Sequence, residues 1–279
     1  MNFPKFQLAK YIDTLLDYLT DHLAWITKAI SEIMSTGMEA ATDGLLLIPS
    51  WLFILVVAVG AYKAVGKRMA LGTMLGLFFL DNLQLWEPTI ETLVLVLIAT
   101  VVAVAIGIPL GILAAIYDGA HRVIMPLLDL MQTMPAFVYL IPAIPFFGLG
   151  PVAAIFSTVI FAMPPAIRLT SLGIRQVPAE LVEAADAYGC DRRQKLIKLQ
   201  LPLALPTIMA GVNQTIMLAL SMVVIAAMIG AGGLGGEVWK AIQRLQPGKG
   251  FEAGIGIVIL AMILDRFTSK LGRNKSADQ

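Results

Sequence analysis

The sequence predicts an all-α integral membrane protein, with about seven transmembrane helices that follow an amphipathic surface helix. Hydrophobic residues make up 58% of the chain, charged residues 14%, and the mean hydropathy is +0.82. A soluble domain carries about 25% charged residues. The apolar residues gather in stretches of about 20, the length that a helix needs to cross a hydrocarbon layer of about 30 Å. The net charge of +1 gives no reason to expect a nucleic-acid partner.

Residues 1–43 form a separate N-terminal element. Its apolar residues recur at spacings of three and four, while charged residues occupy the other side: Leu8, Ile12, Leu15, Leu16, Leu19, Leu23, Ile26, Ile30 and Ile33. This pattern predicts a helix that lies on the extracytoplasmic membrane surface as a scaffold, with a partner-binding helix as the alternative. Because the apolar residues are periodic and no small-residue cleavage site follows, the segment is not a signal peptide.

Residues 44–270 contain the expected membrane spans, and residues 271–279 form a short tail. The hydropathy places the spans near 44–63, 68–86, 89–117, 123–147, 150–170, 204–230 and 252–270. Several spans contain proline, so we expect kinks where neighbouring helices satisfy the freed backbone groups: Pro109, Pro126, Pro135, Pro142, Pro145, Pro164 and Pro165.

The orientation follows from the distribution of lysine and arginine. Fourteen of the 20 basic residues fall on the same side as the long polar loop at 171–203. Since basic residues are enriched on the cytoplasmic side, we expect that loop and the C-terminus in the cytoplasm and the N-terminus outside. Trp25, Trp51, Trp86 and Trp239 then all lie on the outer side, where Trp51 and Trp86 can anchor helix ends at the headgroups.

The loop at 171–203 is polar and coded for helix within an otherwise apolar chain. Pro178 can open a short helix, and Gly189 can take the left-handed conformation that ends it. Asp191 and Gln194 are spaced as a capping box at the start of a second helix. Leu196, Ile197 and Leu199 form the apolar stripe of that helix, and we expect it to end at Pro202. Small side chains at Ala184 and Ala185 allow another protein to approach closely. The pattern favours a helix-turn-helix knob for docking over an ordinary cytoplasmic loop.

The same loop carries a recognisable motif. It reads Glu183-Ala184-Ala185, then Gly189, Leu199 and Pro202, and resembles the EAA loop of ATP-binding-cassette import permeases. Leu199 departs from the isoleucine or valine that the family usually has. Through this resemblance these six residues are expected to couple the chain to an ATPase.

Three further segments resemble one subfamily in particular, the permeases for glycine betaine, proline betaine and related quaternary ammonium compounds. They read DLMQTMPAFVYLIPAIPFFG (129–148), MPPAIRLTSLGIRQVPAELVEAA (163–185) and LPLALPTIMAGVNQTIMLALSMVVIAAMIGAGGLG (201–235). The resemblance covers about residues 45–270. It implies the type I importer permease fold, a two-fold permease dimer, two cytoplasmic ATPase subunits and an extracytoplasmic substrate-binding protein. Choline, carnitine and methionine stay open as substrates, because methionine importers also carry such a loop and a glycine-rich segment.

The chain offers no catalytic site of its own. Gly66-Lys67 is followed by Arg68 and lacks the glycine spacing and the Ser/Thr of a phosphate-binding loop, so we expect ATP and Mg²⁺ to bind the partner ATPase. The only cysteine, Cys190, cannot form an internal disulfide, and His22 and His121 lie in unrelated segments. No resident cofactor or metal site is therefore expected.

Polar residues at matching depth on two spans suggest a substrate pathway. On the topology above, Gln132 with Thr133 and Asn213 with Gln214 lie near the membrane midplane, where polar groups usually face a bundle interior. A quaternary ammonium group favours aromatic walls, which Phe137 and Tyr139 could supply through cation–π contacts. Interhelical hydrogen bonding and core packing are the alternative roles for these six residues.

A glycine-rich segment follows the sixth span at the outer face. Gly230, Gly232, Gly233, Gly235 and Gly236 permit sharp turns, which suggests a gate or a receptor-facing loop rather than a simple connection. A self-sufficient secondary carrier is the rival function from another class. The central helices show neither the inverted repeats nor the intramembrane charges that carriers use for ion coupling.

Overall fold

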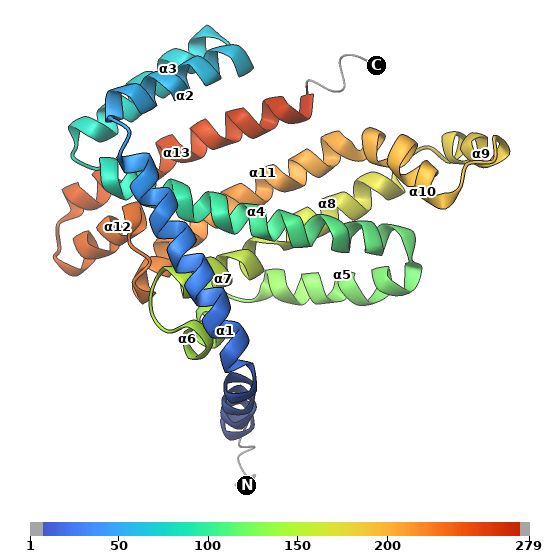
Figure 1. Ribbon diagram of the computed structural model, residues 1–279, viewed down its shortest axis with the longest axis horizontal. Coiled ribbons are helices and arrows are strands. Elements are labelled where there is room, and N and C mark those ends of the chain that lie inside the picture. Colours follow the sequence, from blue (N-terminus) through green and yellow to red (C-terminus); the bar gives the residue numbers. More distant parts are fainter. Residues whose placement is uncertain (1–7, 274–279) are drawn as a thin grey trace, which may run out of the picture.

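The computed structural model describes residues 8–273, and within that range the regular elements are all helices (Figure 1). Four helices form the body of the molecule: α4 (Trp86–Ile116), α7 (Pro151–Ala162), α8 (Pro164–Arg175) and α11 (Leu201–Ala226). The pairs α7 with α8 and α10 with α11 each run on as one long helix, of 25 and 38 residues. The all-α prediction is therefore confirmed for the described residues.

Small residues bring α4, α8 and α11 close together. A Cβ atom on Gly111 would lie 2.6 Å from the carbonyl oxygen of Ile167, and one on Gly211 would lie 3.0 Å from that of Pro165. Helices in lipid associate through such close backbone packing, because the lipid removes most of the hydrophobic driving force. Small polar side chains are buried in the same body: Thr89, Thr92, Thr100, Ser157, Thr158, Thr170 and Thr215.

The largest apolar core lies where α4, α7 and α11 meet. It includes Ile90, Leu95, Ile155 and Met222, each exposed by 2% or less. The C-terminal end of α1 (Leu8–Leu46) joins this core through Met38, which is also buried. The rest of α1 leads away from the body toward the N-terminus (Figure 1). The predicted N-terminal helix is thus present, and its location on a membrane surface stays a prediction.

The expected span at 123–147 is broken. It consists of α5 (Asp118–Thr133), the 3₁₀ helix η1 (Ala136–Tyr139) and α6 (Leu140–Phe147), with a bend of 112° between the two arms. Pro135 explains the break, since it lacks an N–H and holds Met134 in an extended conformation with ψ of 136°. The kink expected at Pro135 is thus present, and it is sharp enough to divide the segment into separate helices.

The expected spans at 44–63 and 68–86 appear as α2 (Ser50–Ala64) and α3 (Lys67–Asn82), which pack against each other. At 15 and 16 residues, each is shorter than the roughly 20 residues that cross a bilayer. A turn at Leu47–Pro49 separates α2 from α1 by a bend of 97°. The N-terminal element accordingly ends at Leu46 rather than at residue 43.

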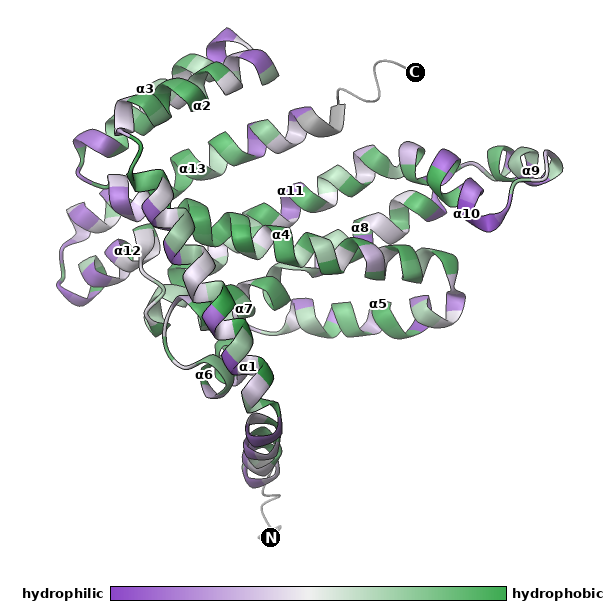
Figure 2. Cartoon of the chain, viewed as in Figure 1, coloured by the Kyte–Doolittle hydropathy of each residue, from purple (hydrophilic) through white to green (hydrophobic). Residues whose placement is uncertain are grey.

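Residues 231–251 hold a helix that the sequence analysis missed. This helix, α12 (Gly233–Gln243), packs against α4 and α13 (Pro247–Arg273). The helix α13 runs through the start of the predicted tail, and residues 274–279 lie outside the described part of the chain. In that part, three helices are long and apolar enough to cross a membrane, or up to five when each bent pair counts as one span. Apolar residues dominate these helices, whereas polar ones mark α10 and α12 (Figure 2).

Candidate functional site

The loop at 171–203 forms the helix-turn-helix that its sequence predicts. Its first helix, α9 (Ala179–Ala187), begins after Pro178, which caps it with φ of −52°. The helix has no buried residue, and it lies at the far end of the molecule from α12 (Figure 1). Glu183 and Ala184 are exposed on it, while Ala185 is half-buried. An exposed helix at the tip of a rigid body is available to a partner protein.

Gly189 ends α9 in the left-handed conformation, with φ of 76°. The N–H of Gly189 donates to the carbonyl of Asp186, and the N–H of Cys190 donates to that of Ala185, both at 3.0 Å. These two bonds make a Schellman motif, which satisfies carbonyls that the helix end would leave free. The conformation requires a residue that tolerates positive φ, so the position of glycine in the motif has a backbone cause.

The second helix, α10 (Arg192–Lys195), begins with the predicted capping box. The Asp191 carboxylate accepts from the Gln194 N–H at 2.7 Å, and the Gln194 side chain accepts from the Asp191 N–H at 3.2 Å. Lys195 ties the two helices together, since its Nζ donates to both carboxylate oxygens of Asp186 at 2.6 and 2.8 Å. The capping box thus fixes the start of α10, and the ion pair between Lys195 and Asp186 holds α10 against α9.

Pro202 does not end the second helix, so that prediction was wrong. A π-helical segment, η2 (Leu196–Gln200), leads from α10 into α11, and the N–H of Leu201 donates to the carbonyl of Leu196. Pro202 lies in the first turn of α11, directly after this wider turn, so its missing N–H does not interrupt the helix. Leu199 is half-buried in this segment. The loop is thus continuous with the long apolar helix α11.

Arg175 anchors the other end of the loop. Its guanidinium donates to the carbonyl of Ala114 at the end of α4, with the nearer nitrogen at 3.0 Å, and to the Asp118 carboxylate at 2.7 Å. Glu183 lines a hollow of about 320 Å³ beside Arg175 and Gln200, where the knob meets the body. No local sequence pattern indicates this role of Arg175, because its partners lie about 60 residues away in the chain.

The predicted pathway residues on the broken helix divide into two groups. Gln132, Thr133 and Phe137 are exposed, with Phe137 at 52%. Tyr139 is buried, its ring packs edge-on against Phe161 at 5.6 Å, and its hydroxyl donates to the carbonyl of Met131. Only the first group can therefore meet a molecule outside this chain, and Tyr139 supports the break in the helix instead.

Asn213 and Gln214 differ in the same way. Asn213 Nδ2 donates to Asp265 Oδ1 at 2.8 Å, and Asn213 Oδ1 accepts from Thr268 at 2.6 Å, which joins α11 to α13. Gln214 is exposed. The helix α8 packs against both α5 and α11 and lies between them (Figure 1), so Gln132 and Asn213 do not share one lining within this chain. For Asn213 the alternative role, interhelical hydrogen bonding, describes the contacts.

The glycine-rich segment is tightly packed. Gly230, Gly232 and Gly233 have φ of 90°, 75° and 64°, and α12 begins directly at Gly233. The backbone N–H of Gly233 donates to the Glu91 carboxylate at 2.7 Å, and the next N–H donates to the Thr92 hydroxyl at 2.8 Å. A Cβ on Gly235 would lie 2.5 Å from the carbonyl oxygen of Val223. The glycine-rich segment is therefore a turn into a helix, held in place by hydrogen bonds to α4 and by close packing on α11.

Comparison with known proteins gives a family match. The model of the binding-protein-dependent transport system inner membrane component matches residues 107–275. The solved structure of the MetNI methionine ABC transporter in an inward-facing conformation aligns with a TM-score of 0.62 at 22% identity, over 66% of this chain and 93% of that chain. This similarity shows the fold alone. It is the type I importer permease fold, as the resemblance in sequence implied.

Curated relatives match along almost the whole chain. The glycine betaine transport system permease protein OpuAB of Bacillus subtilis is 47% identical over 98% of this chain and 97% of its own length. The glycine betaine/carnitine transport permease protein GbuB of Listeria monocytogenes is 48% identical over 99% of both chains. The glycine betaine/proline betaine transport system permease protein ProW of Escherichia coli is 46% identical, over 96% of this chain and 75% of its own.

Proposed function

The chain belongs to the binding-protein-dependent transport system inner membrane components, and from that membership we propose that it imports glycine betaine or a related quaternary ammonium compound as the permease subunit of an ATP-binding-cassette importer. The observation that carries this proposal is the similarity, at 46–48% identity and over at least 96% of this chain, to three betaine permeases. Membership in this family also argues against the alternative function, that of a self-sufficient secondary carrier.

The knob formed by α9 and α10 is the proposed contact with the ATPase. Its six motif residues are Glu183, Ala184, Ala185, Gly189, Leu199 and Pro202. Exposed small residues on α9 allow close approach, and the unbroken helix behind α10 can carry a movement of the ATPase into the membrane. ATP and Mg²⁺ then bind the ATPase dimer, and this chain contributes no hydrolytic site.

A second copy of the chain is the proposed partner within the membrane. The broken helix presents a row of exposed apolar side chains that would face lipid in a monomer: Val123, Leu127, Leu130, Phe137 and Ile141, each at least 52% exposed. Placing a two-fold partner against this row would enclose Gln132, Thr133 and Phe137 between the two copies. We assign these three residues, with Gln214, to the substrate pathway.

The binding protein is proposed to meet the outer face, at α12 and the glycine turn before it. In this orientation the N-terminus lies outside and the C-terminus in the cytoplasm of a bacterial inner membrane, and α1 lies along the outer surface. The braced turn at Gly230–Gly235 would then present a fixed surface to the binding protein and would not act as a mobile gate. Carnitine is the second candidate substrate, because the name of one relative includes it.

Uptake by reconstituted vesicles tests the proposal. The permease is purified with the ATPase and binding protein of the same organism and inserted in liposomes with ATP sealed on the ATPase side. We expect uptake of radiolabelled glycine betaine that requires both ATP and the binding protein. Unlabelled carnitine, choline, proline betaine and methionine, each added in excess, rank the alternatives by competition.

Two results would refute this assignment. Uptake that a sodium or proton gradient drives without ATP would contradict the import mechanism. Uptake that methionine blocks and glycine betaine does not would contradict the substrate class and leave the mechanism intact.

A further inference from the structure

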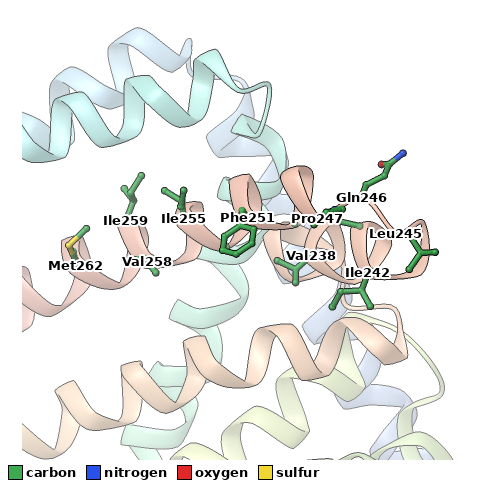
Figure 3. A pocket seen from close by; sticks show the side chains of 13 residues that line it. Val238, Ile242, Leu245, Gln246, Pro247, Phe251, Ile255, Val258, Ile259 and Met262 are labelled. Carbon is green, nitrogen blue, oxygen red and sulfur yellow. The ribbon is translucent and has the colours of Figure 1, made fainter.

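An open apolar groove runs between α12 and the first half of α13 (Figure 3). Its volume is about 990 Å³, and Gln246 is the only polar side chain among those that line it. One wall consists of residues of α13 at spacings of three and four, which form a single face of that helix: Phe251, Ile255, Val258 and Met262. All four are at least 45% exposed.

The groove lies on the side of the molecule away from the proposed partner copy. Between α13 and α5 lie α11, α4 and α8, so α13 and the broken helix that begins with α5 lie on different sides of the molecule (Figure 1). Residues 247–262 extend about 22 Å at 1.5 Å per residue, which exceeds the roughly 15 Å depth of one lipid leaflet. The groove is therefore long enough to hold an acyl chain over the full depth of one leaflet.

Basic residues adjoin in sequence the residues that line the groove at the turn between α12 and α13. Lys240, Arg244 and Lys249 fall within ten residues of each other and are all exposed. Lys240 pairs with Glu237 at 2.7 Å, whereas Arg244 and Lys249 have no ion-pair partner in the described part of the chain. With Glu252 as the remaining carboxylate of this segment, the end of the groove carries net positive charge.

The turn between α12 and α13 holds a bulky residue in an unusual conformation. Leu245 has φ of 53°, a left-handed conformation that favours glycine, and its side chain is 89% exposed beside the groove. Strained residues persist where the surrounding structure or a function requires them. An exposed leucine close in sequence to two basic residues without ion-pair partners is suited to the depth in a membrane at which acyl chains meet headgroups.

We propose that this groove binds an anionic phospholipid, with one acyl chain along Phe251, Ile255 and Met262 and its phosphate beside Arg244 and Lys249. Charge complementarity at one end and an apolar channel of chain length at the other identify the ligand. The choice of the outer leaflet rests on the proposed orientation, but the site itself does not depend on transport.

Photolabelling in vesicles tests the proposal. The permease with its ATPase is reconstituted in phosphatidylcholine that contains a small fraction of phosphatidylglycerol with a photoactivatable acyl chain. A phosphatidylcholine probe with the same chain serves as the reference. After irradiation, labelled peptides are mapped, and labelling of residues 242–262 is divided by labelling of the exposed face of α3, which includes Leu71, Leu75 and Phe78.

We expect phosphatidylglycerol to label the groove about fivefold more strongly than phosphatidylcholine for each basic residue that contacts the headgroup. The double variant Arg244→Gln/Lys249→Gln should bring the two probes to equal labelling. Gly254→Leu should reduce labelling by both probes, because Gly254 lines the groove and its Cβ position is open. Gly72→Leu on α3, another open position, is the matched control and should change nothing in the groove.

Equal labelling by the two probes in the wild-type protein would overturn the proposal and leave only unselective lipid contact. Absence of label between residues 242 and 262 would also overturn it, since a second copy or another protein would then cover the groove. Loss of selectivity in the charge variant needs no change in folding, because both residues are exposed. Neither result bears on whether the permease transports glycine betaine.

Discussion

Gly189 is the residue on which the shape of the docking knob depends most directly. Its φ of 76° and the two hydrogen bonds of the Schellman motif set the direction in which the chain leaves α9. The sequence identified this residue correctly, because a glycine just after a helical pattern has one common structural role. The neighbouring ion pair of Asp186 and Lys195 was not foreseen, since it depends on how two helices meet in space.

We predict that Gly189→Pro lowers ATP-driven uptake by about tenfold or more, because proline cannot adopt positive φ and removes the N–H that bonds Asp186. Gly189→Asn is the matched control and should retain most of the uptake, since asparagine tolerates the left-handed conformation. Both variants should insert in the membrane normally. Wild-type uptake and ATPase association in Gly189→Pro would contradict the docking role.

Alanine at Gly235 and alanine at Gly236 should affect stability differently, although the two residues are adjacent. A Cβ at 235 would lie 2.5 Å from the carbonyl oxygen of Val223, whereas one at 236 meets nothing within 4 Å. Gly235→Ala should therefore cost about 1–3 kcal/mol through overpacking and lower the Tm of the detergent-purified protein by several degrees. Gly236→Ala should leave the Tm almost unchanged. Equal Tm values for the two variants would show that the packing of α12 on α11 is loose.

At the scale of elements, the order and type of the helices could be predicted from the sequence, but not the points where they break or continue. Hydropathy located α4, α8 and α11, because long apolar stretches leave few alternatives in a membrane. Proline was a good guide at Pro135, where a kink was expected and the helix breaks, but not at Pro202, where the helix was expected to end and continues. The difference lies in the π-helical turn before Pro202, which depends on the local packing and has no simple sequence signal.

The helix α12 was missed for a related reason. Its first turn is glycine-rich, and glycine is unfavourable within helices. Its N-terminus is stabilised by Glu91 and Thr92, which lie 142 residues away in the chain. Long-range capping of this kind cannot be recognised from local sequence patterns.

The contact between α11 and α13 depends on Asn213. We predict that Asn213→Leu costs about 0.6–2 kcal/mol, because it removes hydrogen bonds to Asp265 and Thr268 within the membrane part of the protein. The adjacent Gln214→Leu, at an exposed position, should keep the stability and instead change uptake if this residue faces substrate. Thermal unfolding in detergent and uptake in vesicles separate the two effects. An Asn213→Leu variant that keeps its stability but has reduced uptake would contradict the structural role and indicate that Asn213 lines the substrate pathway.

At the scale of the whole molecule, the docking knob and the glycine turn lie at opposite ends, with the long helices between them (Figure 1). This separation agrees with a protein that receives energy at one membrane face and substrate at the other. The individual pathway residues were the weakest part of the sequence analysis, since depth in the membrane does not tell which side of a helix a residue occupies. For that reason Tyr139 and Asn213 were predicted to line the pathway, whereas in the structure they make contacts with other helices of the same chain.

The central claim is that α9 docks on the ATPase, and site-specific photocrosslinking tests it most directly. Tyr188, which is 90% exposed at the end of α9, is replaced by a photoreactive phenylalanine derivative, and Tyr62 on α2, at 60% exposure, is replaced in the same way as the control. In the purified complex we predict a crosslink from position 188 to the ATPase and none from position 62. A complex that stays assembled but gives no crosslink at 188, or gives one to the binding protein, would contradict the account.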